Sequence, residues 1–142
     1  MPWSLLVIEG ADRLETFGER AAEFARRHTD AKWPHKPGFK VFWGAPVLIL
    51  ISARRDSTES LFDCCRAGQN LLLAAHARGL GTCWLGAPMP WLASAEVREE
   101  IGIEKGFDPA VAIVVGYSDE TPLGKPRPKP SIRWFDDQSV NS

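Results

Sequence analysis

Blocks of apolar residues along the chain alternate between the spacing of strands and the spacing of helices. The continuous apolar runs Ala45–Ala53 and Ala110–Tyr117 are typical of strands that are buried on both faces of a sheet. The run Trp3–Glu9 also predicts a buried strand, and Gly81–Gly86 predicts a short strand fenced by glycines. Between these runs the apolar positions recur as they do on one face of a helix.

Helical spacing covers residues 11–28, 56–79 and 94–101. In the first of these segments an apolar stripe lies opposite a charged face, so we expect a helix on the protein surface. The stripe consists of Leu14, Phe17, Ala21, Phe24 and Ala25. In the last segment Ser94 can cap a short helix whose inner side carries Val97 and Ile101.

Residues 56–86, an apolar helix followed by the glycine-fenced strand, are the stretch around which the chain is organised. Asp56 and Glu59 predict a helix cap, and Gly79 is placed to end the helix in a left-handed conformation. Gly86 has no Cβ, so a flat group can lie against its backbone. Two interpretations stay open: a core helix that turns into a central strand, or a ligand platform made of backbone amides. The expected buried face of the helix holds Leu61, Cys64, Cys65, Gly68, Leu71, Leu72 and Ala75.

Residues 29–44 interrupt the pattern with prolines and glycines, and the aromatic side chains in this segment predict a functional or well-anchored loop. These aromatics, which are Trp33, Phe39, Phe42 and Trp43, either cover an apolar pocket or fix the loop to the core. His28 and His35 have no acid or cysteine at ligand spacing, so we expect neither a metal site nor a catalytic histidine here.

The composition excludes several classes of protein. A chain of 142 residues with 44% hydrophobic residues fits a single domain, 1–142, and its net charge of -1 argues against nucleic-acid or anionic-membrane partners. Three cysteines make neither a disulfide framework nor a zinc motif, which suits a reducing cytoplasm. No apolar run approaches the roughly 20 residues of a membrane span. The alternation of strands and helices predicts a three-layer α/β or α+β sandwich.

Candidate chemistry is sparse. The sequence has no nucleophile elbow, P-loop, dinucleotide fingerprint or paired carboxylates, so no catalytic or metal-binding side chain is predicted. Lys125 and Arg127 stand two apart on a proline-stiffened segment, where extended residues point the same way. They can clamp a phosphate, or they can belong to a solvated basic tail that continues to Lys129.

The segments AGQNLLLAAHARGLGTCWLGAP, residues 67–88, and GFDPAVAIVVGYSDETPLGKPRPKP, residues 106–130, resemble the FMN-dependent nitroreductase family. The order of strand, long helix, glycine-fenced strand, second strand and basic tail follows that family. Pro2-Trp3 also resembles the family's Gln-Pro-Trp segment. The resemblance implies an α+β three-layer α/β/α sandwich with a mostly antiparallel sheet.

The resemblance also implies a homodimer with FMN at its interface and NAD(P)H as the reductant. Trp84, Leu85 and Gly86 would bind the flavin, and Lys125 and Arg127 would contact its phosphate. The reduced flavin would pass electrons to a nitroaromatic, a quinone or a similar small acceptor. The apolar helix 56–79 and the apolar tail Ile132–Phe135 give an independent reason to expect a homodimer.

In the family, an Arg-Arg-Ser cluster and a Ser-x-x-Asn segment precede the Gln-Pro-Trp segment. This chain begins at Met1-Pro2-Trp3, so we expect a domain that is N-terminally truncated relative to the family. Loss of those contacts predicts weak FMN binding and slow turnover. The alternative expectation is a nitroreductase-like dimer that acts as a non-catalytic binding or scaffold module.

Overall fold

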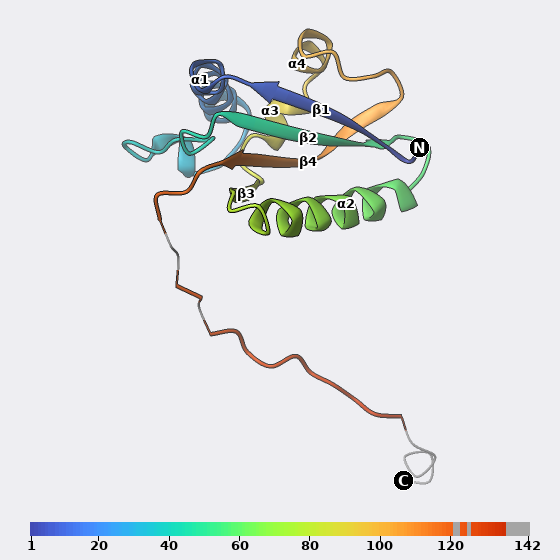
Figure 1. Cartoon of the computed structure of the whole chain (residues 1–142). Coiled ribbons are helices and arrows are strands. Elements are labelled where there is room, and N and C mark those ends of the chain that lie inside the picture. The colour runs from blue at the N-terminus through green and yellow to red at the C-terminus, as the bar shows by residue number, and fades with distance from the viewer. Residues whose placement is uncertain (121–122, 125, 136–142) are drawn as a thin grey trace.

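The computed structural model describes residues 1–120, 123–124 and 126–135. Strands and helices alternate along it, beginning with a strand that pairs at the edge of a sheet (Figure 1). The elements are β1 (Trp3–Glu9), α1 (Ala11–His28), the 3-10 helix η1 (Trp33–His35), β2 (Val47–Arg54), α2 (Glu59–His76), β3 (Gly81–Leu85), α3 (Met89–Leu92), α4 (Ala95–Glu100) and β4 (Phe107–Gly116).

The sheet has the strand order β1-β2-β4-β3, and every neighbouring pair is antiparallel. Helix α2 covers one face of the sheet, and α1, α3 and α4 lie on the other face (Figure 1). The expected α+β sandwich with an antiparallel sheet is therefore confirmed.

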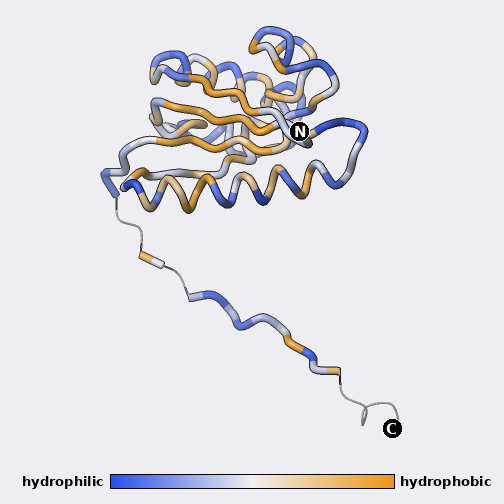
Figure 2. The backbone as a smooth tube through the Cα atoms, turned by 45° about the vertical axis from the view of Figure 1, so that its right-hand side comes forward, coloured by the Kyte–Doolittle hydropathy of each residue, from blue (hydrophilic) through white to orange (hydrophobic). Residues whose placement is uncertain are grey.

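Side chains that alternate along the strands build a core on each side of the sheet. On the α1 side, Leu48 and Leu50 of β2 pack with Ala112 and Val114 of β4, and on the α2 side Ile51 packs with Val111, Ile113 and Cys64. Figure 2 shows these apolar strands in the middle of the domain and helices along which hydrophilic and hydrophobic residues alternate. Strands buried on both faces account for the unbroken apolar runs in the sequence.

Strand β4 begins at Phe107, earlier than the predicted start at Ala110. The register between β2 and β4 shifts between Ile51 and Ser52, and Pro109 pairs with Ser52 at this irregularity. A proline is tolerated in a strand where a bulge removes the need for its missing N–H. The turn predicted for the residues before Ala110 is thus partly strand.

The predicted helix cap at Asp56 is wrong. Helix α2 begins at Glu59, and its N-cap residue Thr58 makes no side-chain hydrogen bond to the helix. Arg54 donates two hydrogen bonds to the Asp56 carboxylate and so occupies the group that would have capped the helix. The predicted helix end is confirmed, because Gly79 follows α2 with a left-handed φ of 74°.

The aromatic loop, residues 29–44, is fixed to the core through its second half. Val41 and Phe42 are buried in the α1-side core, and Trp33 and Phe39 pack against it. Trp43 is an exception, since its side chain is 62% exposed and its φ of 57° is left-handed. The anchoring interpretation therefore holds for Phe42, whereas Trp43 faces solvent.

The chain beyond Tyr117 has no helix or strand in its described residues and extends away from the sheet (Figure 1). Its apolar side chains are exposed, with Trp134 at 86% and Phe135 at 85%. Among the described residues no helix is both long enough and apolar enough to cross a bilayer. The described ranges also contain no cluster of His, Cys, Asp and Glu that could hold a metal ion.

Candidate functional site

Strand β3 is an edge of the sheet as the structure describes it, because it pairs with β4 on one side only. The chain enters it from α2 through the left-handed turn at Gly79. An edge strand carries backbone N–H and C=O groups that no neighbouring strand uses. Strand β3, Gly81–Leu85, therefore has one edge that no described strand pairs with.

Trp84 and Leu85 point to opposite faces of the sheet, as consecutive strand residues do. Leu85 is only 5% exposed and belongs to the α1-side core. The indole of Trp84 lies on the α2 side, where it packs against the backbone of Gly68 and remains 39% exposed. Leu85 can therefore offer a ligand its backbone but not its side chain.

Gly86 follows β3 directly and is exposed. A Cβ built at this residue would meet no described heavy atom within 4 Å. Its φ is not left-handed, so its backbone conformation is one that any residue adopts. The bare backbone of Gly86 is therefore an open surface and not a requirement of the turn itself.

The basic pair predicted from the tail is only partly described. Arg127 is exposed and lies on the extended segment that leaves the domain. Lys125 lies outside the described residues. Within this chain the segment runs away from the sheet (Figure 1), so the described structure does not bring Arg127 to Leu85 and Gly86.

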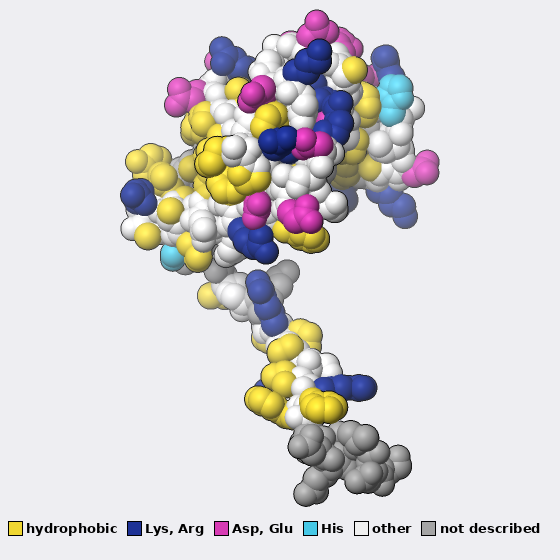
Figure 3. Space-filling view, turned by 90° about the vertical axis from the view of Figure 1, so that its right-hand side faces the viewer, with side chains coloured by type: hydrophobic (Ala, Val, Ile, Leu, Met, Phe, Trp, Pro, Cys, Tyr) yellow, Lys and Arg dark blue, Asp and Glu magenta, His cyan; other side chains and the backbone are white. Residues whose placement is uncertain are grey.

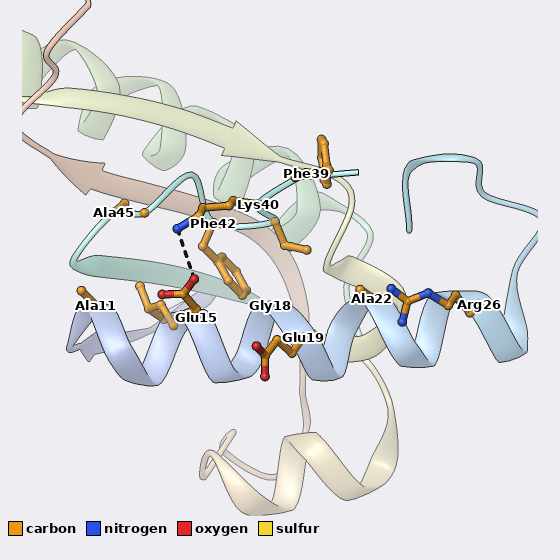
Figure 4. Close-up of a pocket in the computed structure, with 14 residues that line it drawn as sticks. Ala11, Glu15, Gly18, Glu19, Ala22, Arg26, Phe39, Lys40, Phe42 and Ala45 are labelled. Atoms are coloured by element: carbon orange, nitrogen blue, oxygen red, sulfur yellow. Dashed lines mark hydrogen bonds and ion pairs between the residues drawn. The ribbon is translucent and has the colours of Figure 1, made fainter. Parts of the chain in front are cut away.

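A separate cavity of about 340 Å³ lies between α1 and residues 38–45 (Figure 4). Its floor includes Gly18 and Phe42, and at its mouth the Lys40 ammonium donates to the Glu15 carboxylate at 3.1 Å. Phe42 thus both fixes the loop and lines a pocket. Of the residues predicted for the flavin site, Trp84, Leu85, Gly86 and Arg127 are absent from its described lining.

Two ionisable groups near α2 and the sheet have pKa values that are shifted by burial or by ion pairing. Burial raises the pKa of the Cys64 thiol, which keeps it protonated and unreactive. At the far end of β2, Arg55 donates two hydrogen bonds to Asp108, which also pairs with Arg98. The hydrogen bonds from Arg55 hold the pKa of the Asp108 carboxyl below its ordinary value.

Much of the outer surface of α2 and of β1 is apolar. Phe62 and Leu73 of α2 are 58% and 59% exposed, and Leu5 and Val7 of β1 are 57% and 55% exposed. Leu61 and Cys65, which were expected to be buried, are exposed as well. Figure 3 shows hydrophobic side chains at the surface of the domain and along the tail, among scattered charges.

Comparison with known proteins identifies the family. A model of the nitroreductase family matches residues 1–117, which contain the whole sheet and both layers of helices. The chain belongs to the nitroreductase family. The match includes β3 and Gly86, so the bare backbone at the sheet edge is part of the nitroreductase domain.

A relative from Methanothermobacter thermautotrophicus, named NADH dehydrogenase/NAD(P)H nitroreductase, is 32% identical over 127 residues. The aligned region covers 85% of this chain and 58% of the relative. The chain therefore spans less than two thirds of that relative's length.

Solved structures of nitroreductases share the fold. A nitroreductase with bound FMN from Bacteroides fragilis has a TM-score of 0.78 at 23% identity, over 95% of this chain and 76% of its own. Another with bound FMN, from Desulfitobacterium hafniense, has a TM-score of 0.77 at 19% identity, with the shares again 95% and 76%. At these identities the likeness establishes the nitroreductase fold.

Proposed function

We propose that the chain is a flavin oxidoreductase that binds FMN and passes a hydride from NAD(P)H, by way of the flavin, to a nitroaromatic, a quinone or a similar small acceptor. The observation that supports this most directly is the bare backbone at Leu85–Gly86, where an exposed glycine follows an open strand edge. The family match and the fold shared with FMN-bound nitroreductases support the same conclusion.

The residues at this edge fit a flat ring. A planar group can approach Gly86 closely because no side chain covers the backbone there. Leu85 is held in the core, so the backbone beside the ring is fixed before the ligand arrives. FMN supplies the hydride chemistry when it is bound, and the protein supplies position and electrostatics. This division explains why the sequence shows no acid–base pair.

The phosphate of FMN is proposed to bind Lys125 and Arg127. A guanidinium and an ammonium two residues apart in the sequence suit a phosphate. Because the segment that carries Arg127 leaves the domain, this contact needs the segment to lie closer to a bound FMN than it lies to Leu85 and Gly86 in the described structure.

We further propose a homodimer. The exposed apolar side chains on α2, on β1 and in the tail need a cover, and a second copy of the chain offers one that is self-complementary. A reducing cytoplasm remains a proposal that rests on the cysteine usage of the sequence.

The direct test is a titration of the purified chain with FMN, followed by quenching of flavin fluorescence, and then an assay of acceptor-dependent NAD(P)H oxidation. Saturable binding together with turnover is the expected result. Failure to bind FMN at all would overturn the proposal. Binding without turnover, or a colourless dimer, would favour the alternative of a non-catalytic binding module, which the outward direction of the tail supports.

A further inference from the structure

Gly68 is a buried glycine inside α2, a position where glycine is disfavoured relative to alanine. A Cβ built on it would lie 2.8 Å from Cζ3 and 3.1 Å from Cη2 of Trp84, and 3.3 Å from Cγ1 of Val111. These contacts are shorter than ordinary van der Waals separations between carbon atoms. The indole of Trp84 therefore occupies the volume that any side chain at residue 68 would need.

We propose that Gly68 and Trp84 form a seat that holds β3 against α2 and thereby sets the position of the Leu85–Gly86 backbone. In this proposal Gly68 is a positioning residue for the flavin site, although it touches no ligand. The statement that Gly68 affects the flavin site rests on the proposed function, namely that FMN lies at Leu85–Gly86. The statement that Gly68 and Trp84 hold β3 against α2 rests on the contacts alone.

Strand β3 needs such a seat because it is short and lies at the edge of the described sheet. It is bonded to β4 on one side, with Trp84 opposite Ile113 and Leu85 opposite Ala112. Its last two residues are anchors that face opposite layers, since Trp84 packs on α2 and Leu85 enters the α1-side core. Because Gly86 directly follows Trp84 and Leu85 in the chain, a displacement of either residue also displaces the backbone of Gly86.

The chain contains a matched control for this seat. Gly18 is also a buried glycine inside a helix, α1. A Cβ built at Gly18 would lie 3.6 Å from Cδ2 of Phe42 and 3.6 Å from Cβ of Val41, which are ordinary contacts. Alanine therefore fits at Gly18 and does not fit at Gly68.

The experiment compares Gly68→Ala with Gly18→Ala. The Gly68→Ala variant should change the Trp84 emission spectrum, identified by difference against Trp84→Phe, and weaken FMN binding roughly tenfold or more, since small misplacements in a preorganised site are costly. The Gly18→Ala variant should leave both unchanged. A third variant, Val97→Ala in α4, lowers stability in the α1-side core, on the face of the sheet opposite to Gly68, and should keep the wild-type affinity for FMN.

A second substitution that removes the crowding distinguishes a positioning role of Gly68 from general destabilisation. Trp84→Phe removes the outer ring of the indole, which contains both atoms that crowd residue 68. In the double variant Gly68→Ala/Trp84→Phe, FMN affinity should recover to within about threefold of Trp84→Phe alone, as expected for two substitutions that share one contact.

The outcomes distinguish the seat from the proposed function. If wild-type chain fails to bind FMN, the proposed function is wrong, and the Trp84 emission still tests the seat. If wild-type binds FMN and Gly68→Ala binds it equally well, the positioning role is wrong and the proposed function stands. Equal loss of affinity in Gly68→Ala and Val97→Ala would show that general destabilisation, and not the seat, sets the affinity.

Discussion

Substituting Gly86 with valine should raise or preserve the stability of the free protein while abolishing FMN binding. The two effects have opposite signs because the site is open in the free chain and filled in the complex. No described heavy atom lies within 4 Å of the position that a Cβ at Gly86 would take, and its φ is not left-handed. The folded protein therefore gains no clash at Cβ and none of the strain of a left-handed φ from the change.

The expected gain in stability comes from the lower conformational entropy of the unfolded chain. Replacing a glycine at a compatible site stabilises a protein by about 0.4–1 kcal/mol, because the unfolded state loses conformational freedom. For a domain of this size that corresponds to a rise in melting temperature of about 1–4 °C. By contrast, ligand present at a hundred times its Kd stabilises the wild-type chain by about 2.7 kcal/mol. FMN should not stabilise the Gly86→Val variant at all.

The assay is thermal unfolding with and without FMN, with Gly79→Val as the control. A Cβ at Gly79 would also meet no described atom within 4 Å, but its φ of 74° is left-handed, so valine there should destabilise the free protein. If Gly86→Val unfolds at as low a temperature as Gly79→Val, then Gly86 is required for the stability of the fold. If Gly86→Val keeps its response to FMN, the ring lies elsewhere.

Three further predictions concern charge and assembly. Arg127→Ala should weaken FMN roughly tenfold more than it weakens riboflavin, by titration, whereas Lys129→Ala should not, and equal losses for both flavins would place the phosphate elsewhere. Phe62, which is 58% exposed on α2, should lie in the dimer interface, so Phe62→Glu should sediment as a monomer while Lys105→Glu stays dimeric; a monomeric wild type would contradict this. The pKa of Asp108 is lowered by Arg55, so this carboxylate stabilises the fold above its unfolded pKa of about 3.9 and the contribution disappears as pH falls through the lower folded value. Asp108→Asn should therefore cost about 1 kcal/mol at neutral pH, discounted for exposure, and nothing in strong acid; a pH-independent cost would refute the charge argument.

Most strand and helix positions were predictable from periodicity, although the short helix α3 was not. The bounds predicted for β1 and α1 coincide with the structure, and the inward stripe of α1 is buried at Leu14, Phe17 and Ala21. The burial predicted for β1 is wrong, because only Ile8 of this edge strand is buried. Strand β4 was predicted too short because Pro109 argues against a strand unless a bulge is known to lie there. Bulges arise from pairing between distant segments, which local pattern does not contain.

Side-chain contacts between elements were not predictable. Asp56 has the right spacing to cap α2, yet the guanidinium of Arg54 competes for its carboxylate. Gly68 looked like one more small residue on an apolar helix face, because nothing local indicates that an indole from β3 needs its space. The pocket closed by Glu15 and Lys40 likewise joins segments whose proximity depends on the folded core.

The two glycines around β3 bring these arguments together. The space next to Gly86 is empty in the described structure, whereas the space next to Gly68 is filled by the indole of Trp84. A binding site formed by backbone atoms needs both kinds of glycine. Side chains on both faces must hold the edge strand in place, and the edge itself must stay uncovered for the ligand. Stability and FMN affinity should therefore separate at Gly86 and fall together at Gly68. If valine at Gly86 and alanine at Gly68 lowered stability equally, the edge of β3 would be ordinary packing and the flavin would have to bind elsewhere.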